Sequence, residues 1–242
     1  MNLSESIAFM DTQVTTFTLF DFKTRANKWF SFTQMGIFPM TVGQVEGLVA
    51  LKLMGSGAAN GFGIKPNFSR YCLIAIWTDE ACANAFFENN KTFKNYASRA
   101  YAKQTIFLKN TMSHGSWGGS NPFKLGAEYN KSLPVAVITR ATIKWKNMIR
   151  FWRDVPAVSQ NLSEHKGLIF AIGVGELPAR FQATFSIWQS GDDMLQYAYK
   201  AHQHKAIVQK TKEIQWYKEE LFARFVPYKQ IGDELIDTIL VN

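Results

Sequence analysis

The apolar residues of this chain follow the same pattern twice. Residues 47–57 read GLVALKLMGSG and residues 167–176 read GLIFAIGVGE, so each copy places an apolar run between two glycines at the same spacing. Such a run has the length and the residue types of a buried strand. Further along, each copy contains a second strand pattern that ends in Ile-Trp, at Trp77 and at Trp188. A repeat of this length predicts two halves of similar structure.

In the first half, the spacing of apolar residues predicts the order strand, helix, strand, strand, helix. Gly36 and Pro39 are expected to end the first helix. Thr78-Asp79-Glu80 is expected to begin the second, because acidic side chains there favour the helix dipole, and Asn89-Asn90 is a candidate break within it. The predicted elements are a strand at 14–22, a helix at 25–35, a strand from Gly47, a strand at 71–77 and a helix at 81–101.

The second half repeats this order and adds a closing strand. Its predicted elements are a strand at 135–143, a helix at 144–153, a strand from Gly167, a strand at 181–188, a helix from Asp192 and a strand at 219–226. A β-α-β-β-α-β unit is the ferredoxin-like motif. We therefore expect an α+β fold in which two tandem ferredoxin-like repeats, residues 1–125 and 126–242, pair their sheets into one α/β barrel with helices outside. The Gly- and Ser-rich residues 113–122 are the expected boundary loop.

Composition narrows the class of partner. The chain has 27 Lys and Arg against 19 Asp and Glu, a formal charge of +8, and the cations are scattered. This favours an acidic protein or an anionic membrane surface over nucleic acid, for which no zinc-finger or RNA-binding signature is found. The two cysteines form no CxxC pair, the first residues lack the pattern of a signal peptide, and no apolar run reaches the ~20 residues of a membrane span. A cytoplasmic protein is expected, with peripheral membrane contact as an open alternative.

His204 is the most informative candidate for chemistry. On the helix predicted from Asp192 it shares one face with small and apolar residues, whereas His202 falls on the wet side. An imidazole directed at the sheet can ligate a metal or a haem iron, although a structural histidine is the alternative. An ungapped match of the two halves places Phe93 opposite His204, so the fold does not require histidine there.

Residues 180–188 alternate between a polar and an apolar face, and the polar face carries Gln182, Thr184 and Ser186. If this face looks into the barrel, it lines a cavity that can hold a bound oxygen species or a polar group of a substrate. If it looks at solvent, it is an ordinary exposed face.

Arg140 and Arg224 are cations inside otherwise apolar strands. Such an arginine is usually paired, and a haem propionate is a fitting partner, with an ion pair to Glu176, Glu219 or Glu220 as the alternative. The glycine-rich residues 55–63 do not match a phosphate-binding loop and are either an entrance lid or a plain surface loop.

Several segments resemble the spheroidene monooxygenase family of carotenoid biosynthesis. These are VITRATI at 137–143, Phe151-Trp152, GVGELP at 173–178 with TFSIW at 184–188, and the closing residues 204–225. The resemblance implies a dimeric-α/β-barrel-type fold and oxygen-dependent hydroxylation of an acyclic carotenoid, followed by oxidation to a ketone. It also implies haem b, an electron donor such as ferredoxin and a possible homodimer.

On this resemblance His204 is the proximal haem ligand, with His202 as its competitor. Gln182, Thr184 and Ser186 would border the oxygen-binding side, and Arg140 or Arg224 would pair a propionate. Two other functions stay open. One is a haem enzyme of a different reaction, such as an aldoxime dehydratase, because fold and haem do not fix the reaction. The other is a barrel that binds haem or an apolar ligand without catalysis.

Overall fold

The computed structural model describes residues 11–57, 66–144, 162, 165–176, 181–200, 217–236 and 240. These residues form eight strands and four helices. The first half contains β1 (Val14–Asp21), α1 (Arg25–Thr41), β2 (Leu48–Gly57), β3 (Pro66–Trp77), α2 (Glu80–Asn89), α3 (Lys91–Ala97) and β4 (Ala102–Gly115). The second half contains β5 (Val135–Ile143), β6 (Leu168–Gly175), β7 (Phe181–Trp188), α5 (Gly191–Lys200) and β8 (Tyr217–Gly232).

All eight strands join one closed barrel in the order β1-β3-β2-β6-β7-β5-β8-β4, and every neighbouring pair is antiparallel. The expected α+β class and the barrel are therefore confirmed. Within the barrel, the first four strands lie in the order β4-β1-β3-β2 and the last four in the order β8-β5-β7-β6. The segments after β5 and after α5 fall mostly outside the described residues, including the helix expected at 144–153, so the tandem ferredoxin-like assignment and the division at residue 125 stay predictions.

The repeated sequence pattern has a counterpart in strand register. Gly55 of β2 pairs directly with Gly175 of β6, so the equivalent glycines of the two copies meet where the halves join. Trp77 lies opposite Val14, and Trp188 lies opposite Val135. A register shift follows Leu48 in β2 and the matching Leu168 in β6. The two copies of the pattern therefore occupy equivalent places in the barrel.

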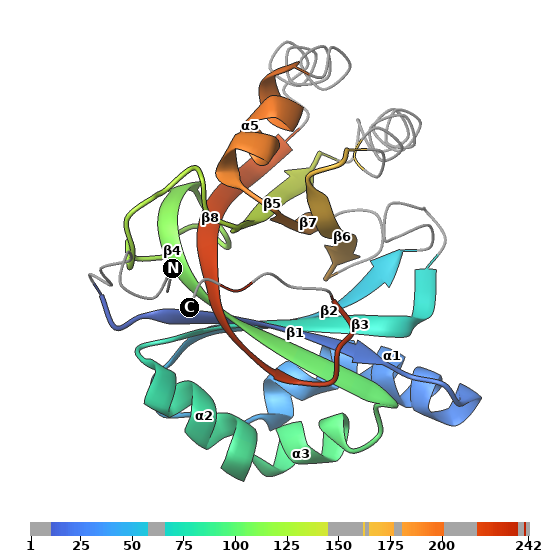
Figure 1. Cartoon of the computed structure of the whole chain (residues 1–242). Helices are drawn as coiled ribbons and strands as arrows, with labels where there is room; N and C mark the ends of the chain where they lie inside the picture. The colour runs from blue at the N-terminus through green and yellow to red at the C-terminus, as the bar shows by residue number, and fades with distance from the viewer. Residues whose placement is uncertain are drawn as a thin grey trace.

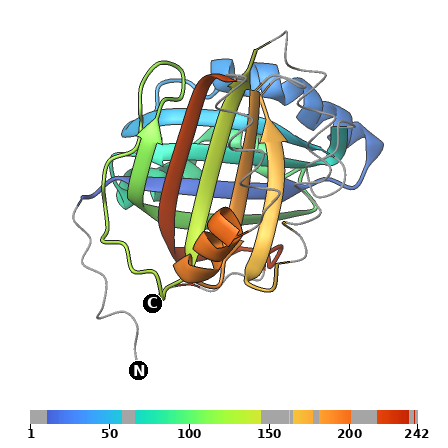
Figure 2. The same cartoon turned by 90° about the horizontal axis from the view of Figure 1, so that it is seen from above.

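Apolar side chains form an interior core and two outer layers. The barrel interior is filled from both halves, with the rings of Phe17 and Phe185 stacked 3.7 Å apart. Outside the first-half strands, a second cluster packs under α1, α2 and α3, which lie together on one side of the barrel (Figure 1). A third, smaller cluster includes Trp188 and Met194 and lies between the second-half strands and α5 (Figure 2). Among the described residues, the outer face of the first half is thus buried more extensively than the outer face of the second half.

Several elements differ from the sequence predictions. Helix α1 continues through Gly36 and Pro39 to Thr41, because Phe38 is fully buried and keeps the last turn packed on the sheet. The helix expected to run to Tyr101 is two helices that meet at Asn90, as the candidate break predicted, and the second ends at Ala97. Strand β4 was not among the predicted elements, and its last three residues pair with β8 although they were assigned to the boundary loop.

The close packing of Gly47 against the start of α2 can be tested by its effect on the stability of the fold. Its φ is +68°, and a Cβ there would lie 2.6 Å from the Thr78 hydroxyl and would collide with Cys82 at the start of α2. Gly43 also has a positive φ, +77°, but no atom lies within 4 Å of its Cβ position. We expect Gly43→Ala to cost about 1 kcal/mol from backbone strain alone. Gly47→Ala should cost about 2 kcal/mol more from overpacking. Urea unfolding of both variants measures this, and equal losses would contradict the close approach.

Candidate functional site

The polar face of β7 lies on the outside of the barrel. Ala183, Phe185 and Ile187 belong to the interior core, so their neighbours Gln182, Thr184 and Ser186 must point the other way. Ser186 is buried and accepts a hydrogen bond of 3.0 Å from the indole Nε1 of Trp188. Gln182 and Thr184 are half-buried. The polar face therefore does not line the barrel interior, nor is it a fully exposed surface.

Small side chains surround these polar residues on the outer face. Thr184 is flanked by Thr139 of β5 on one side and by Gly173 of β6 on the other. Ser186 is flanked by Val137 and Ala171 in the same way. Thr139 is exposed. The described part of this face is thus a shallow polar strip without bulky side chains at its centre, while α5 covers the end near Trp188.

Arg224 borders the same strip. It pairs with Val137 across β5 and β8, and its neighbours Ala223 and Phe225 point into the barrel. Its guanidinium lies 4.9 Å from the ring centre of Tyr129 and 5.5 Å from that of Phe222. Its Nε is buried and has no hydrogen-bond partner among the described residues. Arg224 therefore presents a cation with an unused donor on the same face as Ser186, from which Val137 of β5 separates it.

Arg140 faces the opposite side of the sheet. Its side chain is 5% exposed and forms ion pairs inside the barrel with Glu219 and, at 4.0 Å, with Glu176. The ion-pair alternative of the sequence analysis is therefore present at this position. Because Arg140 and Arg224 are on different faces of the second-half sheet, the structure does not bring the two predicted propionate partners together.

Glu219 is the centre of this interior cluster. Its carboxylate accepts hydrogen bonds from the backbone N–H of Gly119 at 2.8 Å, from the Ser116 hydroxyl at 3.0 Å and from Arg140. Burial alone would raise the pKa of Glu219, but these donors together outweigh it and lower the pKa to about 2. These hydrogen bonds connect the segment after β4 with strands β5 and β8.

A cavity of about 710 Å³ opens at the end of the barrel beside this cluster. Its apolar wall includes Ile74 and Ile76, and its rim includes Lys52 and Trp117. Both rim residues bind Glu176, through Lys52 Nζ at 3.0 Å and the Trp117 indole Nε1 at 2.9 Å. Sequence reasoning missed these residues. Lys52 could have been found, because it is, like Arg140, a cation within an apolar strand. Trp117 could not, because it lies in the segment predicted to be the boundary loop.

The predicted iron ligand His204 and its competitor His202 lie outside the described residues, as do residues 58–65 of the glycine-rich loop. Within the described part of the chain, no group of three or more His, Cys, Asp or Glu side chains is arranged to hold a metal ion. In that same part, no helix combines the length and the apolar character needed to cross a bilayer.

Solved structures share the fold of this chain. An aldoxime dehydratase covers 91% of the chain with a TM-score of 0.63 at 9% identity, and 83% of that protein is matched. A second aldoxime dehydratase, crystallised with butyraldoxime, gives the same TM-score at 10% identity, covering 93% of the chain and 85% of its own length. At these identities the similarity concerns the fold alone.

Sequence relatives are much more similar. No family model matches the chain. A spheroidene monooxygenase of Cereibacter sphaeroides is 35% identical over 182 residues, which is 75% of the chain and 56% of that relative. The spheroidene monooxygenases of Rhodobacter capsulatus and Rubrivivax gelatinosus are 36% and 33% identical, over 72% and 73% of the chain. The alignments cover 73% and 67% of these two relatives, and the chain therefore belongs to the spheroidene monooxygenase family.

Proposed function

We propose that this protein is a monooxygenase that inserts oxygen into an acyclic carotenoid or a similar apolar substrate. The observation that carries the proposal is the identity of 33% to 36% with three proteins named spheroidene monooxygenase, each over about three quarters of the chain. The reaction consumes dioxygen, two electrons and two protons, and it gives the hydroxylated product and water. The electrons require a donor, for which a reduced ferredoxin is proposed, and its acidic surface would suit a chain of formal charge +8.

We further propose haem b as the cofactor, bound against the outer face of the second-half sheet. Two features of this face fit the group. Thr139, Gly173 and Thr184 form a row of small residues, bordered by Phe222 of β8, against which a flat macrocycle can lie. Arg224 has a buried Nε without a partner among the described residues, which suits a propionate carboxylate. His204 follows α5 by four residues and is the proposed iron ligand. When bound, haem supplies the activation of dioxygen.

The residues of the chain would bind and orient the reactants. The Thr184 hydroxyl and the Gln182 amide lie on the outer face of β7 and can donate hydrogen bonds to a polar group held there. The Ser186 oxygen already accepts from the Trp188 indole, which holds Ser186 in place beside Thr184. The cluster of Trp188, Met194 and Leu162 covers the neighbouring part of the sheet and excludes water from it. Arg140 is engaged inside the barrel, so we assign the propionate to Arg224.

The finer structural assignments are part of the proposal. We infer that each half is a ferredoxin-like unit, supported by the matching strand orders β4-β1-β3-β2 and β8-β5-β7-β6.

Because a carotenoid resides in a bilayer, peripheral contact with a membrane is also proposed. A homodimer is also part of the proposal. An aldoxime dehydratase reaction is the alternative, and only fold similarity favours it.

Turnover tests the proposal. The purified protein, loaded with haem, is supplied with detergent-solubilised acyclic carotenoid, reduced ferredoxin and dioxygen. We expect a hydroxylated and then a keto carotenoid, and neither product when dioxygen or the donor is omitted. Absence of product in the complete mixture, together with dehydration of an aldoxime by the same preparation, would overturn the carotenoid proposal in favour of the alternative.

A further inference from the structure

Helix α1 has an apolar face that points away from the protein. Trp29 is 67% exposed and Met40 is 77% exposed, and Phe32 and Ile37 lie beside them, also exposed. Their spacing brings these side chains to one side of the helix. The opposite side carries Ser31 and Phe38, both fully buried. A surface helix normally turns its polar residues outward, so folding of the chain does not explain this outward apolar face.

Aromatic contacts extend the face onto the sheet. The rings of Trp29 and Phe32 are 5.7 Å apart, and Phe32 meets Phe68 of β3 edge-on at 5.5 Å. Phe68 is itself 44% exposed. We call the set Trp29, Phe32, Ile37, Met40 and Phe68 the α1 patch.

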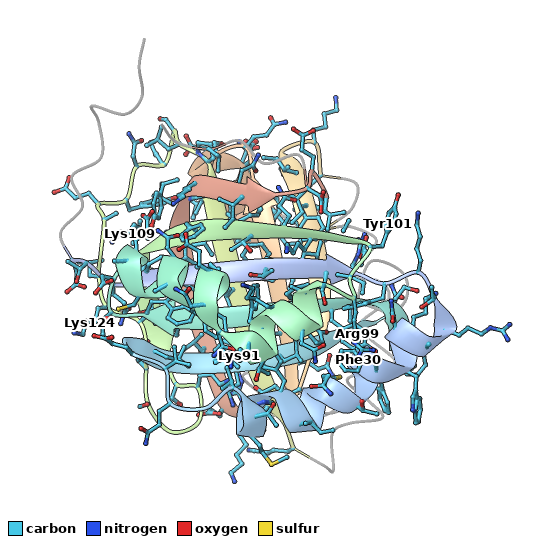
Figure 3. All side chains as sticks on the ribbon, turned by 90° about the horizontal axis from the view of Figure 1, so that it is seen from below. Phe30, Lys91, Arg99, Tyr101, Lys109 and Lys124 are labelled. Carbon is cyan, nitrogen blue, oxygen red and sulfur yellow. The ribbon has the colours of Figure 1, made fainter. Side chains whose placement is uncertain are left out.

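In the segment of the sequence that contains α1, all the charged side chains are cations. Residues 22–45 contain Lys23, Arg25 and Lys28 and no Asp or Glu. A further cation comes from the end of α3, where the Arg99 guanidinium lies 4.1 Å from the ring centre of Phe30. Figure 3 shows Arg99 next to Phe30 of α1. Lys23 Nζ lies 3.0 Å from the ring centre of Tyr101. The two acids that flank this range are Asp21, which Arg70 binds at 2.6 Å, and the exposed Glu46.

We propose that the α1 patch is a docking surface for an anionic lipid bilayer. Exposed Trp and Phe favour the boundary between headgroups and acyl chains, and Met and Ile can insert below it. The neighbouring cations match anionic headgroups, each contributing about 1 kcal/mol near the surface. A second copy of the chain is the other occupant that an apolar face could take, and the test below separates it from a bilayer.

Only the purpose of the docking surface, which is to collect a substrate that is dissolved in membranes, rests on the proposed function. Binding itself requires neither haem nor carotenoid. It can therefore be measured on the full-length protein independently of turnover.

The test is co-sedimentation of the full-length protein with vesicles of phosphatidylcholine alone and of phosphatidylcholine mixed with phosphatidylglycerol. We expect at least about tenfold tighter binding to the anionic vesicles, since two or more cations contribute. The double variant Trp29→Gln/Met40→Gln should lose about tenfold or more of that affinity, because its insertion is removed. Arg25→Gln/Lys28→Gln should narrow the difference between the two vesicle types.

Leu125→Gln is the matched control, because Leu125 is 52% exposed but does not belong to the α1 patch. It should bind within about twofold of the wild type, since single scattered apolar residues do not form an insertion surface. Wild-type binding that Trp29→Gln/Met40→Gln leaves unchanged would overturn the proposal. So would a dimer, or a complex with ferredoxin, that this variant alone dissociates in the absence of vesicles.

Turnover with detergent-solubilised carotenoid should be equal in the wild type and in Trp29→Gln/Met40→Gln, whereas turnover of carotenoid embedded in anionic vesicles should fall with the variant's binding. If no preparation oxidises carotenoid while vesicle binding follows the expected order, the proposed function fails and the docking surface stands.

Discussion

Substitution of His204 by Ala is expected to remove the Soret absorption of the protein purified from haem-supplemented cells and to abolish oxygen-dependent turnover. The imidazole is the proposed axial ligand, and on the helix that the sequence predicts, its face is shared by small or apolar residues such as Ala201 and Val208, which offer no replacement nitrogen. Absorption spectra of the ferric protein and of the reduced protein with carbon monoxide measure the effect.

His202→Ala is the matched control for this experiment. His202 lies two positions away and is expected on the opposite side of the helix, so its loss should leave the Soret band in place. A band lost in His202→Ala and retained in His204→Ala would reverse the assignment. A wild-type protein without a Soret band after haem supplementation would contradict the haem proposal altogether.

Replacement of Arg140 by Met is expected to destabilise the fold by about 3 kcal/mol, because it leaves the Glu219 carboxylate inside the barrel without its cation and removes one of the two cations beside Glu176. Glu219 would keep its bonds from Gly119 and Ser116, and Glu176 would keep Lys52, which limits the loss. Urea unfolding at neutral pH measures the change. Lys131→Met is the control, since Lys131 is 67% exposed and lies 3.9 Å from Asp192, so its loss should cost under about 0.5 kcal/mol.

The effect of Arg140→Met should depend on pH. The pKa of Glu219 is about 2 in the folded protein, below its ordinary value of 4.5. Stability from its ionised form is therefore complete above about pH 4.5 and is lost as the pH falls toward 2. The difference between wild type and Arg140→Met should accordingly be largest at neutral pH and smaller at pH 3. A difference that does not change with pH would mean that packing, and not charge, explains the loss.

Local patterns predicted most of the strands well. The sequence predictions at 135–143 and 181–188 match β5 and β7, because alternation of apolar and polar positions, with β-branched residues among them, marks a strand that buries one face. The repeated glycines and tryptophans predicted which strands are equivalent, and the pairing of Gly55 with Gly175 agrees with that. Strand β4 was missed because its polar residues obscure the alternation, and its pairing with β8 supplies the missing stability.

The candidate site was harder to predict, because alternation shows that two faces exist but not which one is inside. Gln182, Thr184 and Ser186 face outward only because Phe185 stacks on Phe17 from the other half of the chain, a contact that no local pattern contains. Arg140 and Arg224 lie on different faces because of the register of β5 and β8, which no local pattern contains either. The partners of Glu219, Ser116 and Gly119, come from a segment distant in sequence.

The most direct test of the account is the fate of dioxygen. Haem-loaded protein is incubated with acyclic carotenoid and reduced ferredoxin under isotopically labelled dioxygen, and the hydroxylated product is analysed by mass spectrometry, because a carbonyl oxygen exchanges with water. A monooxygenase gives one labelled oxygen atom in that product and none when the label is in the water instead. A product oxygen derived from water, or no oxidised carotenoid at all, would contradict a monooxygenase.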